Sequence, residues 1–144
     1  MSAEWETVES GPADADRTVL LIPGGLNAAR SYAELMAQPA LSGVRLVAVT
    51  LPGHAGAPPP EDFSIETYAR RAADLAADLG CDAVLGFSNG ATVALEMAAS
   101  PPPTSRYLLA NGAFLSWFAR QSPSTAIGGL YDLGGVFSTY STAC

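Results

Sequence analysis

Residues 83–99 read AVLGFSNGATVALEMAA, and this stretch decides the fold that the sequence predicts. The apolar run over 83–85 is typical of a buried strand, and the run over 91–99 is typical of a helix. The two runs meet at Ser88 with almost no connecting chain. The sequence therefore predicts a strand that turns abruptly into a helix at this serine.

Glycines stand two positions before and two positions after Ser88. A sharp strand-to-helix corner brings two backbones so close that only small residues fit there, and Gly86 and Gly90 meet that need. A hydroxyl at such a corner projects beyond the end of the sheet, where it can act as a nucleophile. A second interpretation stays open, in which Ser88 only caps the helix, because serine is a favoured N-cap.

Composition narrows the class of protein. The 144 residues are 49% hydrophobic, which is enough for one core of ordinary size. Seven arginines, no lysine and fourteen acidic residues give a net charge of -7. No basic stripe is present, so we expect no nucleic-acid partner, and we expect a protein kept dispersed by its own charge.

Targeting signals and metal ligands are not visible in the sequence. The first residues are acidic and lack the apolar region of a secretory signal, and no run approaches 18 apolar residues. Cys81 and Cys144 lie far apart without metal-ligand spacing, so we interpret them as reduced thiols. We therefore predict a cytoplasmic location, no membrane span, no metal site and no cofactor; the oligomeric state stays open.

Apolar runs and helical spacing precede the central stretch. We expect an edge strand over 4–10, buried strands over 18–22 and 44–51, and a helix over 30–38 that Pro39 stops.

The clearest helix follows Ser64, because apolar residues recur at helical spacing over 65–79 and Gly80 supplies a stop. Strand and helix thus alternate through the first hundred residues with short connections. This order predicts the α/β class, as a three-layer, doubly wound, mostly parallel sheet with helices on both faces.

The character of the chain changes after Ser100. Residues 101–144 contain three of the 21 charged residues, and Asn111-Gly112 is a strong turn signal with apolar runs on either side. We predict a core over 1–100 and a divergent or truncated C-terminal segment over 101–144.

Three landmarks together resemble the N-terminal half of an α/β-hydrolase of the esterase/lipase-like superfamily. They are Pro23-Gly24-Gly25 after one strand, the loop LPGHAG at 51–56 after the next, and GFSNG at 86–90 after the third. Their order and spacing match, and the resemblance covers residues 18–100. It implies that the chain holds a partial α/β-hydrolase core.

The resemblance also implies nucleophilic catalysis of acyl transfer on a small ester or related substrate. Ser88 would be the catalytic nucleophile of this nucleophile elbow, and the backbone N–H groups of Asn89 and of Gly25, or alternatively Leu26, would form the oxyanion hole. The predicted sheet agrees with this placement of the two amides, because the carboxyl ends of neighbouring parallel strands lie side by side.

The sequence departs from the family in its base and acid. Relatives use a histidine near the C-terminus, whereas the one histidine here, His54, precedes the elbow; we interpret it as a loop residue that hydrogen-bonds locally. Asp132 is the one carboxylate after the elbow helix, and we interpret it as a turn residue. We therefore expect a truncated or frame-altered member, with the break in homology near Pro101.

Three functions stay open at this point. The first is a serine hydrolase impaired by the absence of the triad histidine. The second is a non-catalytic relative that binds a small apolar ligand or a partner in the same crevice. The third is a remnant that folds poorly because its parallel strands lack neighbours.

Overall fold

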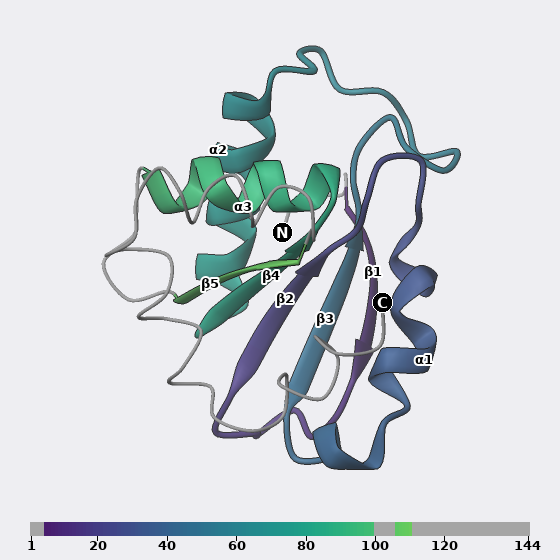
Figure 1. The fold of residues 1–144 in the computed structure, drawn as a ribbon, viewed down its shortest axis with the longest axis vertical. Coiled ribbons are helices and arrows are strands. Elements are labelled where there is room, and N and C mark those ends of the chain that lie inside the picture. Colours follow the sequence, from purple (N-terminus) through teal and green to yellow (C-terminus); the bar gives the residue numbers. More distant parts are fainter. Residues whose placement is uncertain (1–4, 100–105, 111–144) are drawn as a thin grey trace. The chain divides into compact units, whose positions relative to one another are not determined.

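Five strands form one sheet in the computed structural model, which describes residues 5–99 and 106–110 (Figure 1). The strand order is β1-β3-β2-β4-β5, in which β1 is antiparallel to β3 and the other neighbours are parallel. The chain thus runs from β1 at the edge to β2 in the middle, and then winds outward through β3 on one side and through β4 and β5 on the other. The strands are β1 (Glu6–Ser10), β2 (Thr18–Ile22), β3 (Arg45–Thr50), β4 (Ala83–Phe87) and β5 (Arg106–Ala110).

The inner strands are apolar because both of their faces are covered. Leu20, Leu21 and Ile22 of β2 are each at most 1% exposed, although successive side chains point to opposite faces. The edge strand β1 is different, since most of its residues are exposed and Glu6 and Glu9 carry charge there. Charged side chains on an edge discourage pairing with a second chain.

Helices cover both faces of the sheet, which confirms the predicted three-layer class (Figure 1). On one face, α2 (Ile65–Asp78) and α3 (Asn89–Ala99) pack against each other and against a core that includes Leu20, Val47 and Val84. On the other face lie η1 (Ala29–Tyr32), α1 (Ala33–Met36) and η2 (Pro39–Leu41). The Ala29 N–H donates to Oγ1 of the fully buried Thr50, which fixes this layer to β3.

The continuous helix that we expected over 30–38 is wrong. The structure has a 3-10 turn, η1, followed by the four-residue α1. Gln38 is extended, with φ of -68° and ψ of 126°, because the residue before a proline is disfavoured in the helical region. The apolar pattern was correct about the helical character of this segment, but not about its length.

A polar contact aligns the starts of β2 and β4. The Asp82 carboxylate accepts a hydrogen bond from the Thr18 N–H at 2.8 Å, and the Asp82 N–H donates to the Thr18 carbonyl, also at 2.8 Å. The resulting register pairs Val19 with Ala83 and Ile22 with Gly86. The loops that follow β2 and β4 therefore leave the sheet at the same level.

The division at residue 100 stays a prediction. β5 lies beyond it and pairs along its whole length with β4, and the first compact unit of the chain ends at Ala110. The turn expected at 111–112 and Asp132 lie outside the described residues. Within the described residues, no helix is long and apolar enough to cross a membrane.

Side chains before α2 fix where that helix begins. The hydroxyl of Ser64, the N-cap, accepts a hydrogen bond from the Thr67 N–H at 3.3 Å. The Asp62 carboxylate accepts hydrogen bonds from the hydroxyls of Thr67 at 2.6 Å and Ser64 at 2.7 Å, and from the Ser64 N–H at 2.9 Å. These bonds, that of Thr67 first, lower the pKa of Asp62 to about 2.

Because this pKa is lowered from 3.8 to about 2, ionised Asp62 stabilises the fold above pH ~3.8, and that contribution is lost as the pH falls towards ~2. We expect Asp62→Asn to unfold at a lower urea concentration than the wild type at pH 6, and the difference to shrink towards pH 2. Urea titrations followed by circular dichroism measure this. Glu61→Gln is the control, and an Asp62→Asn difference that does not change with pH would contradict the assignment.

Candidate active site at the β4–α3 corner

Ser88 forms the corner between β4 and α3. Its φ is +52°, a left-handed conformation that costs a non-glycine residue about 1–2 kcal/mol. Its carbonyl accepts hydrogen bonds from the N–H groups of Ala91 at 2.9 Å and Thr92 at 3.3 Å, so the helix starts directly after it. The side chain of Ser88 is exposed. A strained, exposed serine therefore occupies the position that the sequence predicts.

The capping interpretation of Ser88 does not agree with this geometry. A capping serine has an extended backbone and accepts a hydrogen bond from an N–H in the first turn. The φ of Ser88 is positive, and its hydroxyl makes no hydrogen bond with the described residues. The hydroxyl is left available for another partner.

The two glycines around Ser88 are needed because backbone meets backbone there. A methyl group added at Gly86 would overlap the carbonyl of Gly90, and one added at Gly90 would overlap the carbonyl of Ile22. The first residues of α3 thus lie directly against the end of β2. This close approach holds the corner over the loop that follows β2.

The loop after β2 lies beside the corner. A methyl group added at Gly24 would lie 3.4 Å from Cβ of Ser88 and 3.4 Å from the ring of Phe87, and one added at Gly25 would lie 3.8 Å from Cβ of Asn89. The structure thus brings together Gly25, Ser88 and Asn89, the three residues that the sequence singles out.

The turn over 24–27 decides which backbone amide is free. The Asn27 N–H donates to the Gly24 carbonyl at 3.2 Å, and Leu26 has a φ of +66°, as the third residue of a type II turn requires. The Leu26 N–H donates to Nδ1 of His54 at 3.0 Å. Of the two alternatives for the oxyanion donor, Leu26 is engaged, whereas the Gly25 N–H has no acceptor among the described residues.

His54 makes a hydrogen bond to a residue more distant in the chain than the sequence indicates. We expected a local hydrogen bond, but its ring binds the amide of Leu26, 28 residues earlier. Its other contact is with Tyr68 of α2, edge to face, with ring centroids 6.0 Å apart and an interplanar angle of 75°. No hydrogen bond joins His54 to Ser88. The Pro-Gly-His motif identified the residue, but no pattern in the sequence identifies its partner.

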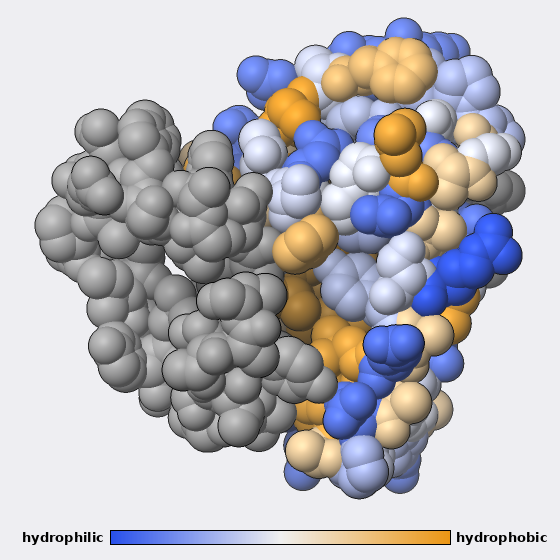
Figure 2. Space-filling model, turned by 45° about the vertical axis from the view of Figure 1, so that its right-hand side comes forward, coloured by the Kyte–Doolittle hydropathy of each residue, from blue (hydrophilic) through white to orange (hydrophobic). Residues whose placement is uncertain are grey.

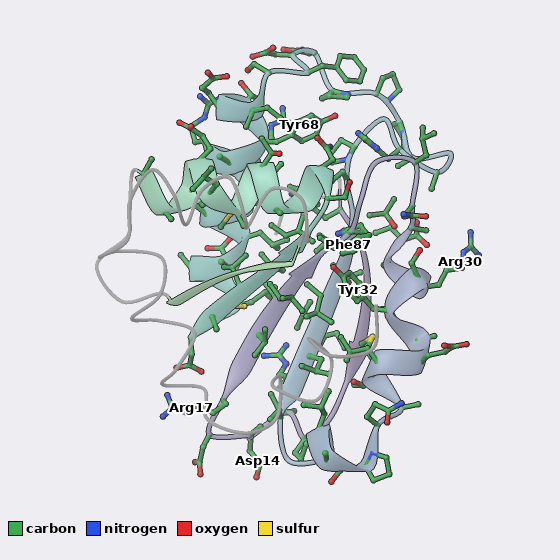
Figure 3. All side chains as sticks on the ribbon, in the orientation of Figure 1. Asp14, Arg17, Arg30, Tyr32, Tyr68 and Phe87 are labelled. Atoms are coloured by element: carbon green, nitrogen blue, oxygen red, sulfur yellow. The ribbon has the colours of Figure 1, made fainter. Side chains whose placement is uncertain are left out.

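Apolar side chains surround the corner. Phe87, at the end of β4, is 51% exposed (Figure 3). Leu26, in the loop after β2, is 84% exposed. On the face shown in Figure 2, polar residues predominate over most of the coloured surface, and hydrophobic residues gather low in the view. The candidate site therefore combines a hydroxyl and a backbone amide, neither of them hydrogen-bonded to a described residue, with apolar neighbours.

Other nucleophiles and metal ligands are scarce in the described part of the chain. Burial raises the pKa of Cys81 to about 11, so this thiol stays protonated at neutral pH. No group of three or more histidine, cysteine, aspartate or glutamate side chains among residues 5–99 could hold a metal ion. Ser88 is thus the candidate nucleophile that the geometry supports.

A family model described as the alpha/beta hydrolase family matches residues 19–141. The chain belongs to the alpha/beta hydrolase family. The match begins in β2 and runs past Pro101, the residue near which the change in composition predicts a break in homology. No curated protein sequence matches the chain.

Solved structures of this family share the fold. One is N-acyl homoserine lactonase AidH complexed with N-butanoyl homoserine, with 25% identity, a TM-score of 0.62, and coverage of 73% of this chain and 40% of that one. A hypothetical protein from Pseudomonas aeruginosa is 29% identical, with a TM-score of 0.59 and coverage of 72% and 37%. The thioesterase domain from the curacin biosynthetic pathway is 22% identical, with a TM-score of 0.64 and coverage of 81% and 47%. The chain thus spans less than half the length of these α/β-hydrolases.

The tight corner generates a prediction about stability. We expect Gly86→Ala to lower the free energy of unfolding by about 2–3 kcal/mol, because the new methyl group would overlap the Gly90 carbonyl and neither backbone can move far. Urea unfolding measures the change. Gly43→Ala is the matched control, since a methyl group at Gly43 meets nothing within 4 Å. Equal stability of the two variants would show that the strand and helix are further apart than the structure has them.

Proposed function

We propose that Ser88 is the nucleophile of a serine hydrolase that acts on a small ester or related acyl substrate. Its Oγ attacks the carbonyl carbon, the leaving group departs, and water then hydrolyses the acyl-enzyme. The observation that carries the proposal is the exposed, strained Ser88 beside two backbone amides that have no acceptor in the described part of the chain. Membership of the alpha/beta hydrolase family supports it.

The N–H groups of Gly25 and Asn89 are the proposed donors to the negatively charged oxygen of the intermediate. Neither has an acceptor among the described residues, and the two residues lie next to each other. Asn89 is also the first residue of the eleven-residue α3, whose N-terminus favours negative charge. Removing one such donor typically costs about 3 kcal/mol of transition-state stabilisation.

Phe87 and Leu26 favour a substrate with a small apolar acyl group. Both side chains are exposed at the corner, and burying them against an acyl chain would add roughly 25 cal/mol for each Å² removed from water. The similar lactonase is complexed with an N-butanoyl compound, which is a ligand of this kind.

The proposed activity is slow because Ser88 lacks a base within reach in the described structure. The single histidine, His54, is hydrogen-bonded to Leu26 and not to Ser88. A positioned general base typically contributes about 10²–10⁴-fold to the rate. The oxyanion donors and substrate binding alone still accelerate acyl transfer about 10³–10⁴-fold over water.

The first test is covalent labelling of Ser88. We expect a fluorophosphonate probe to phosphonylate the protein at one site, which peptide mass spectrometry would assign to Ser88, because the probe reacts with a serine beside an oxyanion hole. Ser88→Ala should abolish the labelling. Ser42→Ala, which changes an exposed serine away from the corner, should leave it unchanged. Labelling that survives in Ser88→Ala would refute the assignment.

The second test concerns the base. If Ser88 reacts slowly because nothing accepts its proton, added imidazole should raise the rate of phosphonylation, by about tenfold at a high concentration of free base. The same imidazole at a pH where it is protonated should have no effect. A rate that does not depend on imidazole would show that proton removal does not limit the reaction.

A second function is favoured by one observation, namely that the Ser88 hydroxyl has no partner to take its proton among the described residues. In this alternative the chain binds a small apolar ligand, or a partner, at the same corner without chemistry. An apolar acyl amide would then bind saturably and with equal affinity to the wild type and to Ser88→Ala, while the fluorophosphonate probe would label neither protein.

A further inference from the structure

We infer that His54 is a positioning residue that holds the 24–27 turn, and with it the Gly25 amide, in place beside Ser88. The inference rests on the proposed function, because it concerns the amide that would bind the oxyanion. It gives a role to the one histidine of the chain, which the proposed chemistry does not use as a base.

The turn needs an external restraint. Leu26 holds a φ of +66°, which a leucine disfavours, and its side chain is 84% exposed, so packing does not offset the strain. Gly25 has no side chain and is free to rotate. Two hydrogen bonds hold the turn, from the Asn27 N–H to the Gly24 carbonyl at 3.2 Å and from the Leu26 N–H to His54 at 3.0 Å. Of the hydrogen bonds between described residues, only the second ties the turn to another part of the chain.

His54 is itself held firmly enough to act as that restraint. Its N–H donates to the Leu51 carbonyl at 3.0 Å, and its carbonyl accepts from the Ala57 N–H at 2.9 Å. Its ring lies edge to face with Tyr68, whose hydroxyl donates to the Pro52 carbonyl at 2.6 Å. Figure 3 shows Tyr68 on α2, level with the loop after β3. The loop after β3 and the helix α2 therefore both hold the His54 ring in position.

The hydrogen bond from the Leu26 N–H determines which nitrogen of the His54 ring carries the proton. A backbone N–H can only donate, so Nδ1 of His54 must be an unprotonated acceptor, and the neutral ring carries its proton on Nε2. The bond restrains the peptide unit between Gly25 and Leu26. Because that unit follows the Gly25 N–H directly in the chain, losing the bond lets the proposed oxyanion donor move.

Two variants of His54 distinguish the effect of its hydrogen-bond acceptor from the effect of its aromatic ring. His54→Asn keeps an acceptor oxygen at about the position of Nδ1, whereas His54→Phe keeps a ring against Tyr68 but has no acceptor. We expect hydrogen exchange of the Leu26 amide to rise about tenfold in His54→Phe and to stay near the wild-type rate in His54→Asn, since one net hydrogen bond corresponds to about that factor. Phosphonylation of Ser88 should slow by a similar factor in His54→Phe and recover in His54→Asn.

The wild-type protein provides a measurement that does not depend on either variant folding. A ¹⁵N–¹⁵N coupling across the hydrogen bond should join the Leu26 amide to Nδ1 of His54, and the ring should show the Nε2-protonated tautomer. Absence of the coupling would overturn the inference. Equal rates of Ser88 labelling in two folded variants would overturn the positioning role alone. An intact coupling with an unreactive wild-type Ser88 would instead overturn the proposed function, and leave the hydrogen bond established.

Discussion

The close approach of α3 to the end of β2 is the contact on which the rest of the site depends. Gly90 lies so near the Ile22 carbonyl that no side chain fits between them, and Gly86 is equally close to Gly90. A helix that begins this near a strand can be reached from β4 only through a sharp turn, which places Ser88 at positive φ. The position of Ser88, the proposed nucleophile, is thus a result of backbone packing and needs no contact of its own side chain.

Three non-glycine residues in the loops at this end of the sheet have positive φ, namely Leu26, Ala55 and Ser88, and two of them belong to the candidate site. Ser88 and Leu26 both adopt left-handed backbone conformations and both have exposed side chains. Ser88 is compensated by the hydrogen bonds of α3 that its carbonyl accepts, whereas Leu26 depends on the ring of His54. Conformations of this cost persist only where surrounding structure determines them, and they cluster at functional sites.

Local patterns predicted the sheet well because its strands are short apolar runs with clear ends. The bounds of β2 agree with the sequence, and Ser64 and Gly80 mark the ends of α2 as expected. The prediction failed over 30–38, where amphipathic spacing indicated one continuous helix. The segment instead changes from a 3-10 turn to an α-helix at Tyr32–Ala33, and the α-helix ends at Met36. Periodicity reports which side of a segment is buried, and it does not report how far the hydrogen bonds continue.

By itself, the sequence determined the corner, because glycines two positions on either side of a serine between a strand and a helix leave few other arrangements. The tertiary structure alone decided which amide of the 24–27 turn is free. That choice depends on a hydrogen bond between Leu26 and His54, which are far apart in the chain and are brought together by the parallel pairing of β2 and β3. A hydrogen bond between residues this far apart in the chain depends on the strand order and register of the sheet, and a local pattern of residues does not specify either.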